Sequence, residues 1–259
     1  MVAEARTTGK MRYVVVDPVM RLSTTDAVRD RARWVPVRPD MDSALAMGMI
    51  RWIFDNERYD AHFLCRPTLK AATDAGEAAY SNAAHLVCLA GPEQGKFLRL
   101  PPDGRKDGDG KPLPGEALVL SPQGALLPAE KCGEAKLFFR GEVTLPGGAK
   151  VEAATALQLL REEAAAHSLE EYAALCGVPV ATIADLAREF TAHGKKAVVD
   201  AHGGMAFAIS RALRFCGVCR GGGASAPPPE TTLISDSGAK YGPPRAARLS
   251  ARRQAFWNR

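Results

Sequence analysis

The sequence predicts an α/β fold: a Rossmann-like parallel sheet flanked by helices, with a small β-rich insert and an irregular C-terminal tail. Two short apolar runs, at residues 12–17 and 34–37, predict the first strands of the sheet. The first run is rich in valine and does not alternate with polar residues, which is typical of a parallel strand buried on both faces. A helical pattern begins at Asp42 soon after the second run, so the chain opens with strand, strand and helix.

The elements that follow are predicted from the periodicity of apolar residues. A helix over 42–55 carries four apolar residues on one face at helical spacing, namely Leu45, Met49, Trp52 and Ile53. A shorter helix is expected near 58–64. The apolar run at 85–90 is expected to form a third strand of the same sheet.

A β-rich insert is predicted over residues 91–150. It begins with a polar segment, 91–116, whose many Gly, Pro and Asp residues are typical of a surface loop. Strands are expected at 117–121 and 135–145, and the Pro-Gly-Gly sequence at 146–148 is expected to close the insert with a turn.

Helices dominate the next segment. One is expected over 154–166, and Ser168 with Glu171 predicts a capping box for the second. Pro179 suits the first turn of a third helix, where its missing N–H costs little. A strand over 196–200 would then return the chain to the sheet.

Charge is distributed unevenly along the chain. The net charge of the 259 residues is +5, but the segment from residue 203 onward has nine Lys and Arg against two acids and carries +7. The remainder is therefore −2, an ordinary globular balance. Residues 205–259 are predicted to be an irregular basic tail, either intrinsically disordered or the product of a shifted reading frame. Aromatic residues are sparse there, so no nucleic-acid partner is expected.

The sequence gives no sign of export, membrane insertion or metal binding. No apolar run approaches the roughly 18 residues that a membrane helix needs, and no secretory signal is recognisable. As written, the chain is expected to be cytoplasmic. Its six cysteines lack the spacing of an iron–sulfur site, and no metal ligand or catalytic residue is assigned.

Two acidic residues follow the first two predicted strands. In open α/β sheets, ligands bind beyond the carboxyl ends of the strands. Asp17 lies where a ribose hydroxyl would bind, although an Asp before Pro18 also suits a turn. The Asp42 carboxylate could accept the two parallel N–H groups of guanine, although it could also cap the helix that follows. Arg38 could pair with a phosphate or remain solvated.

The chain resembles the molybdopterin oxidoreductases of the dimethyl sulfoxide reductase superfamily, and within it the catalytic subunit of tetrathionate reductase. The resemblance covers roughly residues 12–204. In that family, a strand, Asp-Pro-Arg, a second strand, Arg-Pro-Gly-Thr-Asp and a helix form part of the site for molybdopterin guanine dinucleotide. The matching motifs are Asp17-Pro18, Arg38-Pro39, Arg51-Trp52-Ile53, Asn56 to Asp60, Gly76-Glu77-Ala78, Ser81-Asn82-Ala83, Leu157 to Glu162 and Ala201 to Gly204.

The resemblance implies a set of cofactor-binding residues. These are Asp17, Pro18, Arg38, Asp40, Asp42, His202 and Gly203. Asp42 takes the position that reads guanine in the family. Two departures from the family motif concern the same loops: Asp40-Met41 replaces Gly-Thr, and Val19 replaces the Arg of Asp-Pro-Arg. Since glycine permits close backbone approach, these departures predict weaker cofactor binding or a different loop arrangement.

The resemblance further implies a larger parent enzyme. Residues 12–204 would be the molybdopterin-guanine-dinucleotide-binding α/β domain of a molybdenum-dependent oxidoreductase used in anaerobic respiration. The parent would also carry a 4Fe-4S cluster outside this chain. Its expected partners are the missing portions of the same polypeptide, an iron–sulfur electron-transfer subunit, and a membrane anchor subunit. The parent family is exported to the periplasm or is membrane-associated.

Two functional hypotheses follow. In the first, the chain is a fragment of a tetrathionate reductase-like catalytic subunit, which by itself binds the cofactor weakly and has no turnover. In the second, it is a freestanding non-catalytic α/β module that binds a nucleotide or a pterin.

Overall fold

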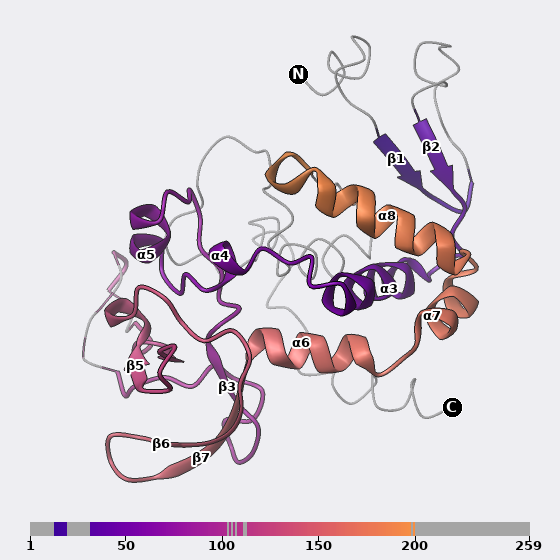
Figure 1. Ribbon diagram of the computed structural model, residues 1–259. Helices are drawn as coiled ribbons and strands as arrows, with labels where there is room; N and C mark the ends of the chain where they lie inside the picture. Colours follow the sequence, from indigo (N-terminus) through magenta and orange to yellow (C-terminus); the bar gives the residue numbers. More distant parts are fainter. Residues whose placement is uncertain are drawn as a thin grey trace. The chain divides into compact units, whose positions relative to one another are not determined.

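The structure is a computed structural model, and the residues it describes lie within one compact unit. They are 13–19, 32–102, 104, 106, 108–110, 113–197 and 199. These residues form a mixture of helices and three small sheets (Figure 1). The α/β class is therefore supported, but the expectation of one Rossmann-like parallel sheet is wrong, because most strand pairs are antiparallel.

The first two strands pair in parallel, as expected. They are β1 (Tyr13–Val16) and β2 (Ala32–Val35), with Val16 opposite Val35. β2 begins two residues earlier than predicted. Val14, Val16 and Trp34 are each about 40% exposed, at 37%, 39% and 40%. The described residues therefore do not bury this pair on both faces, although its valine-rich sequence is typical of a buried parallel strand.

The helix α3 (Asp42–Asp55) has the bounds that the periodicity predicted. Leu45 and Ile53 of its predicted apolar face are buried, whereas Met49 and Trp52 are partly buried. The helix packs against three others, α6 (Ala156–Ala165), α7 (Leu169–Cys176) and α8 (Val180–Ala192). Burial of these apolar faces is the main source of stability for short helices.

The third predicted strand, β3 (Leu86–Cys88), forms but joins a different sheet. It pairs antiparallel with β7 (Lys150–Thr155), which also pairs with β6 (Arg140–Thr144). β7 was not predicted, because Lys-Val-Glu-Ala-Ala-Thr combines charged residues with alanines, which are poor strand formers. Since β7 pairs with the Leu86–Cys88 segment, β3 is not part of the β1–β2 pair.

The β-rich insert forms two hairpins. β4 (Leu118–Leu120) matches the predicted strand and pairs with β5 (Leu126–Pro128), which was not predicted. The strand predicted at 135–145 begins only at Arg140. The predicted turn lies between β6 and β7, where Gly148 adopts a positive φ of 81°.

The helical segments largely follow the prediction. The short helix near 58–64 is α4 (Ala61–Leu64), whereas α5 (Leu69–Asp74) and η1 (Ala129–Lys131) were not predicted. The capping box is confirmed: the Ser168 hydroxyl accepts from the Glu171 N–H, and the Glu171 carboxylate accepts from the Ser168 N–H.

The strand predicted at 196–200 is not found in the described residues. Lys196 ends a 3-10 helix, η2 (Gly194–Lys196), and neither Ala197 nor Val199 belongs to a strand. The other two positions of that prediction lie outside the described residues, as does the predicted tail at 205–259.

Within the described part of the chain, none of the helices combines the length and the hydropathy that a membrane span requires.

Candidate functional site

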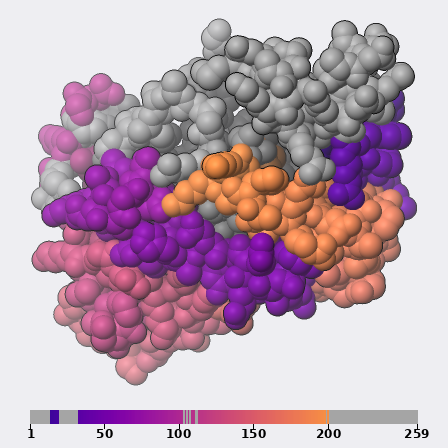
Figure 2. Space-filling view, turned by 45° about the horizontal axis from the view of Figure 1, so that its top comes forward, coloured from indigo at the N-terminus to yellow at the C-terminus, as the bar shows by residue number. Residues whose placement is uncertain are grey.

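Two loops follow the carboxyl ends of β1 and β2, and we call residues 17–19 and 36–42 the strand-end loops. Because the two strands are parallel and hydrogen-bonded, both loops leave the same edge of the pair. The Asp17 N–H donates to the Val35 carbonyl at 3.4 Å, which links the two strand ends. In Figure 2 the indigo residues of β1 and β2 border the orange residues of α8, and Val35 packs in the same cluster as Ile183 of α8.

Asp17 is half-buried and forms a local turn. Its Oδ1 accepts the Val19 N–H at 2.8 Å, and its backbone carbonyl accepts the Trp34 indole N–H at 2.9 Å. The turn interpretation of the Asp-Pro sequence is therefore supported. Since a carboxylate has more acceptor sites than this single bond uses, the turn and a hydroxyl ligand are compatible.

Arg38 contacts the C-terminal end of α7. One guanidinium nitrogen, Nη1, donates to the Ala174 and Leu175 carbonyls at 3.1 Å each, and the Arg38 backbone N–H donates to the Cys176 carbonyl at 2.8 Å. The side chain is exposed, but neither of the two predicted alternatives, a phosphate contact or a purely solvated side chain, anticipated its contacts with α7.

Asp40 occupies a left-handed backbone conformation, with φ of 62°. Glycine is the residue that adopts this conformation without a steric cost, and Asp is among the few others that tolerate it. The conformation explains why a family with Gly at this position would favour it. The exposed Asp40 side chain adds a negative charge to the loop.

Asp42 is the first residue of α3 and does not cap it. The N-cap residue is Met41, which forms no side-chain capping bond. The capping alternative for Asp42 is therefore wrong. The carboxylate is half-buried and accepts no hydrogen bond from the described residues. Its position at the positive end of the helix dipole favours the ionised, acceptor-only form.

The strand-end loops carry three carboxylates and one guanidinium. With Asp17, Asp40 and Asp42 ionised beside Arg38, these side chains sum to −2. This balance favours ligands that donate hydrogen bonds, such as the Watson–Crick edge of guanine or ribose hydroxyls. It disfavours a phosphate group. The other two predicted site residues, His202 and Gly203, lie outside the described residues.

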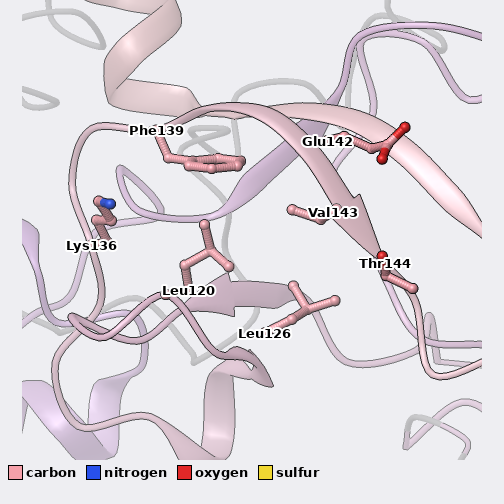
Figure 3. A pocket seen from close by; sticks show the side chains of 8 residues that line it. Leu120, Leu126, Lys136, Phe139, Glu142, Val143 and Thr144 are labelled. Carbon is pink, nitrogen blue, oxygen red and sulfur yellow. The ribbon is translucent and has the colours of Figure 1, made fainter.

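An open groove of about 280 Å³ lies in the β-rich insert, between the β4–β5 hairpin and β6 (Figure 3). Leu120, Leu126, Phe139 and Val143 make it largely apolar, and polar side chains stand at its margin. It contains none of the predicted cofactor residues. Among the described residues, no group of three His, Cys, Asp or Glu side chains could hold a metal ion.

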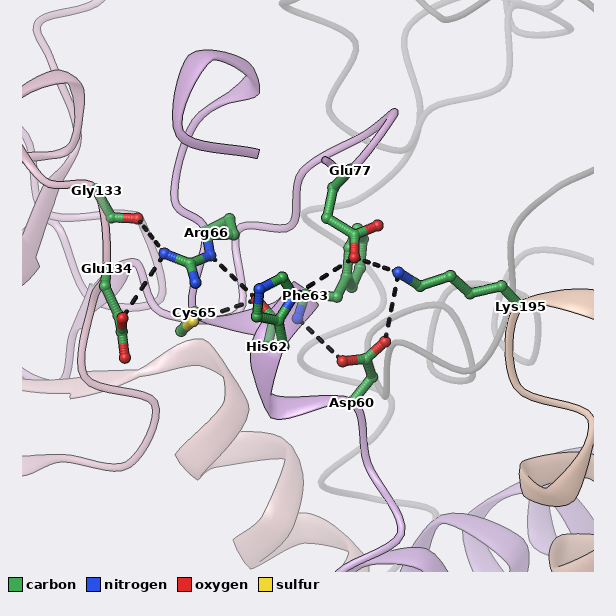
Figure 4. A network of polar contacts seen from close by, with 9 residues as sticks. All are labelled: Asp60, His62, Phe63, Cys65, Arg66, Glu77, Gly133, Glu134 and Lys195. Atoms are coloured by element: carbon green, nitrogen blue, oxygen red, sulfur yellow. Dashed lines mark hydrogen bonds and ion pairs between the residues drawn. The ribbon is translucent and has the colours of Figure 1, made fainter. Parts of the chain in front are cut away.

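A buried carboxylate, Glu77, forms a polar network that the sequence did not predict (Figure 4). Glu77 is only 5% exposed and forms ion pairs with Lys195 of η2 and with His62 of α4, the latter at 3.5 Å. Lys195 also lies 3.9 Å from the Asp60 carboxylate. Glu77 and Lys195 are far apart in sequence, and no local pattern could have revealed the network.

The four described cysteines are buried thiols. Burial is the largest cause that raises the pKa of Cys65, Cys88, Cys132 and Cys176. Each is therefore held as a neutral thiol near pH 7, and the thiolate is the form that reacts or binds metal. The interpretation of isolated cysteines as small buried apolar residues fits these four positions.

Comparison with known proteins identifies relatives among reductase catalytic subunits. The chain is 46% identical to that of tetrathionate reductase from Salmonella typhimurium over 210 residues, which are 78% of this chain and 19% of that protein. It is 37% identical to that of selenate reductase from Mesobacillus selenatarsenatis, covering 78% and 18%. It is 33% identical to that of tetrathionate reductase from Archaeoglobus fulgidus, covering 73% and 16%. The chain thus spans about a fifth of the length of these relatives. No family model matches it.

Proposed function

Because the chain belongs to the molybdopterin oxidoreductases, as a segment homologous to tetrathionate and selenate reductase catalytic subunits, we propose that it contributes the guanine end of a molybdopterin guanine dinucleotide site. The parent enzyme would be a molybdenum-dependent reductase. We propose tetrathionate as its substrate because two of the three relatives above are tetrathionate reductases.

The state of Asp42 is the observation that carries the proposal. Its carboxylate begins α3 at the carboxyl edge of two parallel strands and accepts no hydrogen bond from the described residues. A half-buried carboxylate in this state is suited to accept the adjacent N1–H and amino N–H groups of guanine. Asp17, at the end of the neighbouring strand, would accept a ribose hydroxyl, with Pro18 fixing the turn beside it.

The fit is partial along the cofactor. The acidic strand-end loops suit guanine and ribose, but they offer little to a pyrophosphate, and the described residues offer no molybdenum ligand set. The cofactor would supply two-electron chemistry at molybdenum when bound. This chain's residues would orient its nucleotide end, and Asp40, His202 and Gly203 would contribute from neighbouring positions.

The Asp42→Asn variant is expected to lose guanine recognition. Asparagine presents one N–H donor where guanine also donates, so the paired bonds cannot form. We expect the preference of the chain for GMP over AMP, measured by isothermal titration, to fall roughly 10- to 100-fold, in line with about 1.5–3 kcal/mol for hydrogen bonds to a charged group.

Asp40→Asn is the matched control for this titration. It makes the same chemical change two residues away, at an exposed position where Asn tolerates a positive φ. It should keep the preference for GMP. Equal behaviour of Asp42→Asn and the unmodified chain would contradict the assignment of Asp42.

The isolated chain is expected to have no reductase turnover. A chain that supplies one end of the cofactor site forgoes most of the contacts and orientation that a complete site provides. The test is to reconstitute the chain with molybdopterin guanine dinucleotide and to follow tetrathionate-dependent oxidation of a reduced viologen dye. Robust turnover would show that the chain is a complete catalytic unit.

The remaining portions of the catalytic polypeptide are proposed as the principal partner of this segment. The half-exposed Val14, Val16 and Trp34 of the β1–β2 pair support this proposal, because two-stranded sheets are marginal alone and parallel sheets are normally covered on both faces. By family resemblance, an iron–sulfur subunit, a membrane anchor subunit, and export to the periplasm are proposed for the parent enzyme.

A further inference from the structure

We propose that Arg38 is a positioning residue, which holds the loop that presents Asp42 against the C-terminal end of α7 instead of binding a cofactor phosphate. The inference rests on the proposed function, since it concerns the same strand-end loops. It assigns a different role to a residue whose basic side chain suggests an anion contact.

The contacts of Arg38 complete the C-terminal end of α7. The last four carbonyls of a helix lack intrahelical partners. Here the Ala173 carbonyl accepts the Gly177 N–H at 2.8 Å, and those of the next three residues, Ala174, Leu175 and Cys176, all accept from Arg38. Arg38 thus supplies three of the four bonds from a position more than 130 residues away in sequence.

The same contacts fix the path of the chain toward Asp42. Arg38 is held through both its backbone N–H and its guanidinium, so neither part can shift independently. Pro39 restricts φ, and the Met41 N–H donates back to the Arg38 carbonyl at 3.0 Å. Asp42 therefore begins α3 four residues from an anchored point, with a tight turn between them.

The anchor itself lies on a well-packed element. α7 is stabilised by its capping box and packs against α3, with Tyr172 buried at 2% exposure. The Tyr172 hydroxyl donates toward the Glu163 and Ala164 carbonyls of α6, at 3.4 and 3.3 Å. Arg38 thus ties the strand-end loop to the helical core.

Two features argue against Arg38 as a phosphate ligand. Both protons of Nη1 point to carbonyls of α7, and the negative end of the α7 dipole offsets part of the guanidinium charge. The neighbouring carboxylates of Asp40 and Asp42 would further repel a phosphate.

The Arg38→Met variant tests the inference, with Arg51→Met as the matched control. Arg51 of α3 also donates to a helix C-terminus, through Nη1 to the Ala165 carbonyl of α6 at 3.2 Å, but it is not in the strand-end loops. The full chain is titrated with GMP, AMP and guanosine. Hydrogen exchange is followed at Ala174–Gly177, and thermal unfolding confirms that each variant is folded.

We expect Arg38→Met to lower the preference for GMP over AMP roughly tenfold and to weaken guanosine binding equally, since the phosphate is not involved. Exchange at Ala174–Gly177 should accelerate in this variant and not in Arg51→Met. Arg38→Lys is used if Arg38→Met does not fold. Lysine keeps the charge without the planar fork, and it should lose guanine preference while retaining any phosphate attraction.

Three outcomes would overturn the inference. Arg38→Met could lose only the advantage of GMP over guanosine, which would make Arg38 a phosphate ligand. Arg51→Met could lose guanine preference equally, which would make the effect one of general stability. Exchange at Ala174–Gly177 could remain unchanged in Arg38→Met. Absence of any guanine preference in the unmodified chain would instead overturn the proposed function, and this result is visible before any variant is made.

Discussion

The Gly48→Leu variant is expected to be destabilised by about 3 kcal/mol, a large part of the roughly 5–15 kcal/mol that typically stabilises a domain. Gly48 lies on the buried face of α3, where the helix meets α7 and α8. A Cβ atom at this position would lie 3.2 Å from Tyr172 Cβ and 3.3 Å from Ile183 Cγ2. There is no room beyond it for the remaining carbons of leucine.

Gly48→Ala separates the steric effect from the helical preference of the new residue. Alanine improves helix propensity by up to about 1 kcal/mol over glycine, which offsets the tight contact of its Cβ. We expect its free energy of unfolding to stay within about 1 kcal/mol of the unmodified chain.

Gly133→Leu is the matched control for size. Gly133 is exposed, does not have a positive φ, and has open space around its missing Cβ. Its unfolding free energy in urea should change by no more than about 0.5 kcal/mol. A Gly48→Leu variant as stable as Gly133→Leu would contradict the close packing of α3 on α7 and α8.

The second large effect is expected for Lys195→Met. Glu77 is buried, with a side chain 3% exposed, and Lys195 is its closest cationic partner among the described residues (Figure 4). Removing one partner of a fully buried ion pair costs about 3–5 kcal/mol, because the remaining charge is left uncompensated. Since the Lys195 side chain is 41% exposed, solvent screens the pair, and we expect a loss of about 2 kcal/mol.

The double variant Lys195→Met, Glu77→Gln tests the cause of this loss. Glutamine is nearly isosteric with glutamate and carries no charge, so most of the stability should return. Lys150→Met is the control, because Lys150 pairs with Glu142 at 2.7 Å but both side chains are more than half exposed. Its urea-unfolding cost should be below about 1 kcal/mol. Equal effects of the two lysine variants, or no recovery in the double variant, would contradict a buried charge at Glu77.

The elements predicted correctly are those whose signals are local in sequence. Helix α3 follows from apolar spacing, and the capping box follows from Ser168 and Glu171 three residues apart. β7 was missed because its alanines and charged residues form a strand only through pairing on both sides with β3 and β6. Tertiary pairing of this kind commonly overrides strand propensity.

The candidate site shows the same division. The order of Asp17, Arg38 and Asp42 after two strands could be predicted, and the structure places the loops that carry them at one edge of a parallel pair. The partners of Arg38 and Glu77 could not be predicted, because Ala174, Leu175 and Lys195 are more than 100 residues distant in the chain. The backbone conformation of Asp40 was hinted at only by the glycine that the family has at this position.

The central claim is that the strand-end loops bind the guanine end of the cofactor, and locating a bound guanine nucleotide tests it most directly. We would record ¹H–¹⁵N correlation spectra of the labelled chain during titration with GMP and, separately, with AMP. The account predicts that GMP selectively shifts the amide signals of Asp17, Asp40, Met41 and Asp42. No shift, equal shifts with AMP, or shifts confined to the Leu120–Val143 groove would contradict it.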